Sequence, residues 1–189
     1  MIMSKQRYPA CEAWQVARPL AFALERVCER VEIAGSLRRK KAEVGDIEIL
    51  FIPKIGDAGT DLFARTPISL ADRLIEGWLK DGLLAKRPNK RGHFTWGDEN
   101  KLAIHVQSGI PVDLFSTTER KWWNSLVCRT GGKVNNLLVT RTANDKGYSF
   151  EAYGTGYRNL MGGPHHDCVS EQDVFEFIGL DYKEPQDRL

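Results

Sequence analysis

The sequence predicts an α+β protein, with a mostly antiparallel or mixed sheet flanked by helices and a small C-terminal α+β subdomain. Three observations lead to this class. Helical periodicity dominates both ends of the chain, short β-rich segments lie between them, and the composition is 42% apolar and 28% charged. The same composition excludes collagen-like, low-complexity and wholly disordered chains.

The sequence of residues 1–81 predicts two helices and two strands. Apolar residues recur at helical spacing over residues 9–30, with Pro19 as a kink or break. A short strand at 31–34 leads into a Gly-Ser turn, and a β-rich run at 47–52 ends at Pro53. Residues 54–66 read as a loop, and a second helix is expected over about 70–81.

The remainder predicts more strands and then short helices. Strands are expected at 83–86, 93–96, 102–107 and 112–115, with a Ser-Gly turn joining the last two. Helices follow at 119–127 and 133–145, then a hairpin over 148–160 and a last helix opened by a capping box at Ser170. We expect two domains, residues 1–117 and 118–189.

Charge and cysteine content favour a reduced, cytoplasmic protein. The net charge is only +2, and no apolar stretch or leader-like run suggests a membrane span or secretion. The four cysteines are scattered without a Cys-x-x-Cys pair, so they are expected to be reduced. We therefore expect no membrane partner.

Two acidic residues expected on one strand are the main indication of catalytic chemistry in this sequence. Asp46 and Glu48 stand two positions apart, so a strand projects both carboxylates to the same face. Neighbouring carboxylates repel unless a cation lies between them, and oxygen ligands suit Mg²⁺. The preceding Gly35-Ser36 turn allows close approach to a phosphate, and Arg39 can neutralise it. The combination indicates metal-assisted nucleotidyl transfer.

A third acid extends the pattern. Asp113 alternates with Val112 and Leu114 on another strand, so it faces away from the core. Two metals need bridging acids from more than one strand. Taken singly, each element also fits a solvated turn or surface face, but their ordered combination is much harder to obtain by accident.

Basic residues form two short runs that suit nucleic acid. We expect weak, salt-sensitive DNA binding through Lys40, Lys41, Lys86, Arg87, Lys90 and Arg91. The His165-His166-Asp167-Cys168 segment lacks the usual zinc-ligand spacing, so a polar loop is favoured there over a metal site.

Residues 32–39 and 44–48 resemble the palm signature of family X DNA polymerases, the polymerase-beta-like group of the nucleotidyltransferase superfamily. Residues 109–115 are similar to the strand of the family's third aspartate. Residues 130–136 are similar to its Thr-Gly-Ser segment and downstream Asn, and residues 170–188 to its C-terminal end. The chain departs from the family at Glu48 in place of aspartate, at Cys128-Arg129 in place of an aromatic pair, and at Gly132 in place of serine.

The resemblance implies a nucleotidyltransferase palm over 1–117 and a thumb-like, nascent-base-pair-binding subdomain over 118–189. Asp46, Glu48 and Asp113 would then be catalytic and hold two Mg²⁺ ions, which Mn²⁺ can replace. The residues implied in nucleotide binding are Gly35, Ser36, Arg39, Gly45, Gly131 and Asn136.

The function implied is a monomeric, template-directed DNA polymerase that fills short gaps in repair by adding deoxynucleotides to a primer 3′ end. Its partners would be a primer-template or gapped duplex and a nucleoside triphosphate. Because almost nothing precedes Arg7, no lyase activity is expected. Two alternatives stay open: a template-independent nucleotidyltransferase acting on RNA ends, a protein or a small molecule, and a catalytically idle nucleic-acid-binding module.

Overall fold

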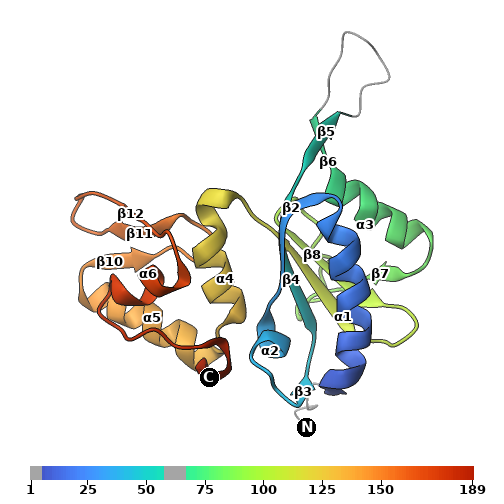
Figure 1. The fold of residues 1–189 in the computed structure, drawn as a ribbon, viewed down its shortest axis with the longest axis horizontal. Helices are drawn as coiled ribbons and strands as arrows, with labels where there is room; N and C mark the ends of the chain where they lie inside the picture. The colour runs from blue at the N-terminus through green and yellow to red at the C-terminus, as the bar shows by residue number, and fades with distance from the viewer. Residues whose placement is uncertain (1–5, 58–66) are drawn as a thin grey trace.

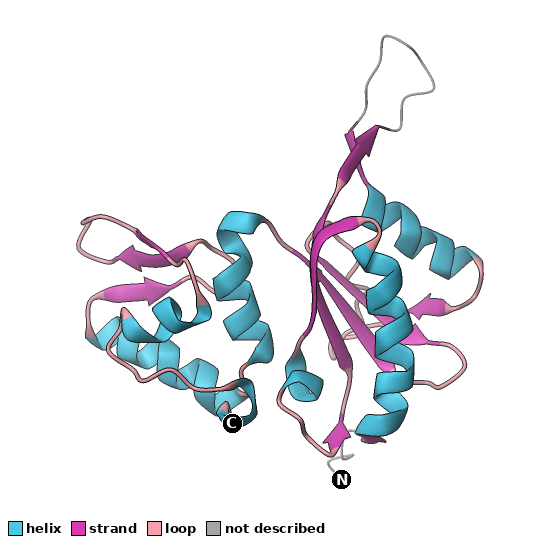
Figure 2. Ribbon diagram, viewed as in Figure 1, coloured by secondary structure: helices cyan, strands magenta, loops and turns pink. Residues whose placement is uncertain are grey.

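The computed structural model describes residues 6–57 and 67–189, which form two lobes joined near residue 117 (Figure 1). Helices and strands are mixed in both lobes, and the predicted α+β class is confirmed (Figure 2). The N-terminal lobe contains β1 (Tyr8–Pro9), α1 (Ala10–Glu25), β2 (Cys28–Ile33), α2 (Gly35–Arg38), β3 (Glu43–Val44), β4 (Ile47–Pro53), β5 (Ile55–Asp57), β6 (Pro67–Ser69), α3 (Leu70–Lys80), β7 (Leu84–Lys86), β8 (Asn100–His105) and β9 (Pro111–Ser116).

The C-terminal lobe is smaller and consists mainly of helices around a short sheet. Its elements are η1 (Glu119–Lys121), α4 (Trp122–Thr130), α5 (Lys133–Asp145), β10 (Tyr148–Phe150), β11 (Gly156–Asn159), β12 (His166–Asp167), α6 (Glu171–Glu176) and η2 (Pro185–Asp187). Its strands pair antiparallel in the order β10-β11-β12.

The main sheet has the order β2-β4-β9-β8-β7 and is mixed. β4 and β9 run parallel in its centre, while every other neighbouring pair in this sheet is antiparallel. A parallel pair needs a crossover, and here α3, β7 and β8 supply it between β4 and β9.

Strand alternation gives the two faces of this sheet different partners. Ile47, Ile49 and Phe51 of β4 are buried in the cluster that α1 and α3 cover. Leu50 and Ile52 point the other way, toward α4, where Trp122 is buried against them. The second face therefore supports the junction with the C-terminal lobe, and the same face carries the acids described below.

Several predicted elements differ from the observed ones. Helix α1 runs through Pro19 but ends at Glu25, because the apolar residues at 27–28 enter the turn and strand β2 instead. The predicted strand at 93–96 is reduced to isolated bridges at Phe94 and Trp96. The predicted loop at 54–66 begins as β5, which pairs with β6, and its residues 58–66 lie outside the described part.

The helices in the described part of the chain are too short or too polar to span a membrane.

Candidate active site

Two acids lie side by side at the centre of the main sheet. β4 and β9 are parallel, and their register pairs Glu48 directly with Asp113. Residues paired across strands share a face of the sheet, so both carboxylates leave the core side and face the C-terminal lobe. Asp46 immediately precedes β4 and stands two residues before Glu48. The structure thus brings the three acids singled out from the sequence to one place.

The pKa of Glu48 reflects its burial and the charged groups that lie close to it. Burial and then the carboxylate of Asp46 raise the pKa of Glu48 to about 7, and Asp113 adds to the effect. The positive charges of Arg129 and Arg39 oppose it. Carboxylates forced together in this way favour a bound cation, and an all-oxygen donor set is the kind that hard divalent ions prefer. The residues present therefore fit a divalent metal.

Gly35 leaves space for the carboxylate of Glu48. Its φ is +62°, in the left-handed region that favours glycine. A Cβ at this position would lie 2.1 Å from Oε2 of Glu48. The main chain of the Gly-Ser segment is also tied to the strand, since the Ala34 N–H donates to the Glu48 carbonyl at 2.8 Å. Glycine is thus required both for the backbone turn and for the position of the acid.

Arg87 extends the row of charged residues across the sheet. The Arg87 N–H donates to the Leu102 carbonyl, and Leu102 is the β8 partner of Asp113. From there the Arg87 guanidinium forms an ion pair with Asp113, and its Nε donates to the Ala103 carbonyl at 3.1 Å. Sequence reasoning assigned Arg87 to DNA binding; the structure places it against an acid of the site.

The two neighbouring arginines of α2 connect the lobes. Arg38 donates to both carboxylate oxygens of Glu171 at 2.8 and 2.7 Å and to the Thr130 hydroxyl at 2.8 Å. Arg188, which is fully buried, donates to the same Glu171 at 2.6 Å. Arg39, predicted to contact phosphate, donates to the Thr130 carbonyl at 2.5 Å. The basic pair therefore joins the sheet lobe to α4 and α6.

Arg129 brings a cation from α4 to the same face. Its guanidinium lies 3.5 Å from the ring centre of Phe115 and forms a hydrogen bond to the Tyr153 hydroxyl. Its charge is close enough to lower the pKa of Glu48. The sequence marked this position only as a departure from the family pattern.

Gly131 and Asn136 lie next to each other where α4 meets α5. A Cβ on Gly131 would approach the Asn136 Oδ1 to 2.0 Å. The Asn136 amide donates to the Cys128 carbonyl at 2.8 Å, which fixes the side chain against the end of α4. The two residues predicted to contact the nucleotide are thus brought together.

The other predicted site residues fall into two groups, buried residues next to the acids and basic residues that are mostly exposed. Ser36 and Gly45 are buried in the segments that flank the acids, at α2 and just before β4. Lys40, Lys86, Lys90 and Arg91 are exposed, and Lys41 is half-buried. Lys86 lies over the Trp96 ring at 4.6 Å. Sequence reasoning did not single out Arg38, Arg129, Glu171 or Arg188 as site residues, although Arg38 lies in the palm motif beside Arg39 and both Glu171 and Arg188 lie in the C-terminal motif at 170–188.

Comparison with known proteins gives matching results for both lobes. Residues 125–189 match the family model of the DNA polymerase beta thumb. DNA polymerase lambda of Rattus norvegicus is 26% identical over 82% of this chain and 28% of its own length. DNA polymerase lambda of Arabidopsis thaliana is 24% identical over 97% of this chain and 37% of its own. The chain therefore spans about a third of the length of these relatives.

A solved structure shows the same fold. The crystal structure of Leishmania infantum polymerase beta, a ternary P/T complex, superposes with a TM-score of 0.74 at 19% identity, covering 97% of this chain and 77% of that one. The mixed-sheet lobe with its acidic row and the matched thumb lobe together have a polymerase-beta-like fold. Within that fold, the chain is similar to the polymerases lambda and beta named above, which are family X polymerases.

Proposed function

We propose that this chain is a template-directed DNA polymerase that adds deoxynucleotides to a primer 3′ end and fills short gaps. The observation that carries the proposal is the pairing of Glu48 with Asp113, with Asp46 alongside, on the sheet face that looks toward the thumb lobe. The similarity to polymerases of family X supports it.

Each group in the proposed site has a distinct task. Asp46, Glu48 and Asp113 would hold two Mg²⁺ ions, which Mn²⁺ can replace; when bound, these ions neutralise charge on the reacting phosphates. Gly35, Ser36 and Gly45 supply backbone close to the acids, where a triphosphate can approach. Arg39 adds positive charge, and the adjacent Gly131 and Asn136 form the thumb side that faces sugar and base.

The reaction forms one bond and breaks one. The primer 3′ hydroxyl gives its proton to a base, the role proposed for Asp113; its oxygen attacks the α-phosphate of the nucleotide in line, and pyrophosphate leaves. The protein contributes mainly position and charge, as is usual in phosphoryl transfer. Exposed Lys40, Lys86, Lys90 and Arg91 would neutralise DNA phosphates at the rim.

Nucleotide incorporation on matched gapped, nicked and single-stranded DNA, with each templating base, tests the proposal. We expect Mg²⁺- or Mn²⁺-dependent addition of the complementary nucleotide, most efficient on the gapped duplex. Asp46→Ala should abolish it, and Asp81→Asn, which alters an exposed acid at the end of α3, should not. Failure of the unaltered protein to incorporate, or equal extension of single-stranded ends regardless of template, would contradict the proposal.

A further inference from the structure

A second group of metal-binding side chains lies in the thumb, outside the acidic site. β12 ends at Asp167, and the N–H of the next residue, Cys168, still donates to the Thr155 carbonyl; the spacing of two places residues 166 and 168 on one face, while 167 takes the other. The ligand atoms of His166, Cys168 and Asp173 lie within 4.8 Å of one another. A residue spacing of two on a strand thus produces a cluster that adjacent histidines in sequence do not suggest.

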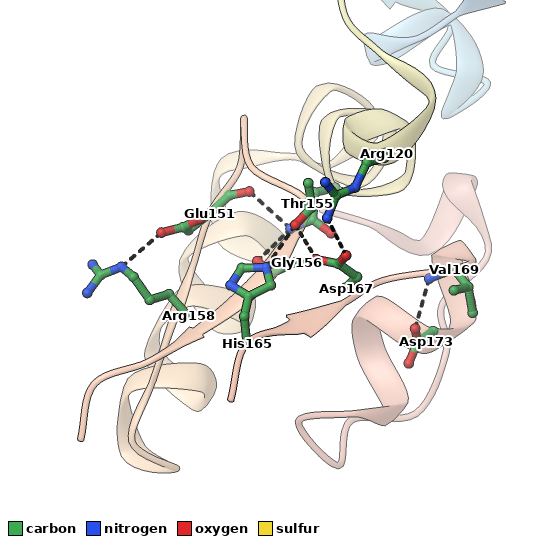
Figure 3. Close-up of polar contacts among 10 residues, drawn as sticks. Arg120, Glu151, Thr155, Gly156, Arg158, His165, Asp167, Val169 and Asp173 are labelled. Carbon is green, nitrogen blue, oxygen red and sulfur yellow. Dashed lines mark hydrogen bonds and ion pairs between the residues drawn. The ribbon is translucent and has the colours of Figure 1, made fainter. Parts of the chain in front are cut away.

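The opposite face of this strand has its own partners. Asp167 pairs with Arg120 at 2.8 Å and accepts a hydrogen bond from Thr155, while His165 lies 2.8 Å from the Thr155 hydroxyl (Figure 3). Charged residues of this segment are therefore divided into two sets. His166, Cys168 and Asp173 form the other set, which offers a nitrogen, a sulfur and an oxygen ligand.

Asp173 is held in place by the start of α6. One of its carboxylate oxygens, Oδ2, accepts from the Val169 N–H at 2.9 Å (Figure 3), and its own N–H donates to the Ser170 hydroxyl. These two bonds leave Oδ1 directed at His166, 2.9 Å from its Nε2. The cap thus holds the carboxylate in one orientation. In metal sites, hydrogen bonds from surrounding residues hold the ligands in the same way.

The other two side chains are equally constrained. The ring of His166 stacks on Phe177, with centroids 3.8 Å apart and planes 5° from parallel. Cys168 is 5% exposed, and its N–H donates to the Thr155 carbonyl at 2.8 Å. All three donors are therefore positioned by packing or backbone bonds before any ion arrives, which reduces the ordering cost of binding.

We propose that His166, Cys168 and Asp173 form a thumb site for one zinc-type divalent cation. A thiolate, an imidazole and a carboxylate are a donor set that zinc accepts, with water in the fourth position. Bound as thiolate and carboxylate, the ligands carry two negative charges, which the cation balances. Binding converts the Cys168 thiol to a thiolate and releases its proton to solvent.

The distances require only a small adjustment. Zinc bonds of about 2.0–2.3 Å in a tetrahedron place the donor atoms roughly 3.3–3.7 Å apart. The Nε2 of His166 and Oδ1 of Asp173, now 2.9 Å apart, would separate slightly, with the cation replacing the shared hydrogen bond. The sulfur of Cys168 would move inward. The bound ion would fasten β12 to α6, the helix whose Glu171 receives the arginine from the other lobe.

Cobalt substitution in the full chain tests the site selectively, because only a thiolate ligand gives Co²⁺ a near-ultraviolet charge-transfer band. We expect one equivalent of Co²⁺ to produce this band, Zn²⁺ to remove it, and excess Mg²⁺ to leave it unchanged. Cys168→Ser should abolish the band. Cys128→Ser, which alters the half-buried thiol closest in sequence to the acidic site, should retain it.

Two further variants keep the thiol and guard against a folding defect in Cys168→Ser. His166→Gln and Asp173→Asn should each weaken Co²⁺ binding by about 100-fold or more, since even the loss of an outer-shell partner costs 10–100-fold. Zn²⁺ should also raise the melting temperature of the unaltered protein but not of these variants. No band at millimolar Co²⁺, or a band that survives in Cys168→Ser, would overturn the proposal.

Discussion

Arg38 of α2 and Glu171 of α6 form a two-pronged hydrogen-bonded ion pair across the two lobes, with N–O distances of 2.8 and 2.7 Å. Glu171 also accepts a hydrogen bond from Arg188, so one buried carboxylate pairs with two guanidinium groups. Removing the carboxylate would leave the buried Arg188 without its acidic partner and Arg38 with only the longer ion pair to Glu32, at 3.3 Å. The junction between the lobes therefore depends strongly on a single acidic side chain.

Glu171→Gln should lower the free energy of unfolding by about 3 kcal/mol, because breaking a buried ion pair leaves an uncompensated charge. Urea unfolding measures this change. Arg120→Gln is the matched control: it removes one member of an exposed ion pair, with Arg120 76% exposed, and should leave stability nearly unchanged. Equal losses in the two variants would contradict the assignment.

The stabilisation by Glu171 should depend on pH in a defined direction. Burial tends to raise the pKa of Glu171, but hydrogen bonds from Arg38 and Arg188 and their charges outweigh it and hold the pKa below its ordinary 4.5. A lowered folded-state pKa means that the stabilisation is complete above 4.5 and is lost as the pH falls through the folded value. The difference in stability between the unaltered protein and Glu171→Gln should hold from pH 7 to about 5 and narrow below it. Urea titrations across this range check the trend; a difference that grows on acidification would oppose it.

Gly35→Ala should reduce both stability and nucleotide incorporation. A Cβ there conflicts with the Glu48 carboxylate, in addition to the cost of a positive φ. Gly82 also has a positive φ, +71°, but open space around its Cβ position. Gly82→Ala should therefore cost only about 1 kcal/mol and leave incorporation unchanged.

The difference between the two glycine variants isolates the contact with Glu48. Displacing a catalytic group by about 1 Å can lower a rate 100-fold, so we expect at least a tenfold loss of kcat in Gly35→Ala. Steady-state kinetics with urea unfolding separate the two effects. If both variants keep full activity, Glu48 does not need the position observed here.

Arg87→Ala and Lys86→Ala should affect different kinetic constants, although the residues are adjacent. Arg87 is paired with Asp113, so its removal should mainly lower kcat by releasing that acid. Lys86 is exposed over Trp96, so its removal should raise the KM for DNA and reduce the salt slope of binding by about one. Kinetics at several salt concentrations distinguish them, and a pure KM effect in Arg87→Ala would count against a positioning role.

The sequence predicted local structure well where one period dominated. The alternation around Ile47 and Ile49 identified β4, and the capping box at Ser170 identified the start of α6. The predicted C-terminal end of α1 was wrong because Val27 and Cys28 suit a helix, a turn or a strand equally. Pairing of β2 with β4 drew Cys28 into the strand. The strand at 93–96 was wrong because alternation alone cannot show whether a partner is in register.

Some features of the candidate site could likewise be predicted from the sequence, and others could not. The spacing of Asp46 and Glu48, and the glycine beside them, are local properties, and the sequence alone determined them together with the α+β class. Only the tertiary structure decided that Arg87 would pair with Asp113, that Arg38 would reach Glu171, and that His166 would meet Cys168 and Asp173. The first two contacts join residues far apart in the sequence, and their geometry is set by sheet register and lobe packing. In the third, a spacing of two places His166 and Cys168 on one face, but the packing of α6 decides that Asp173 meets them.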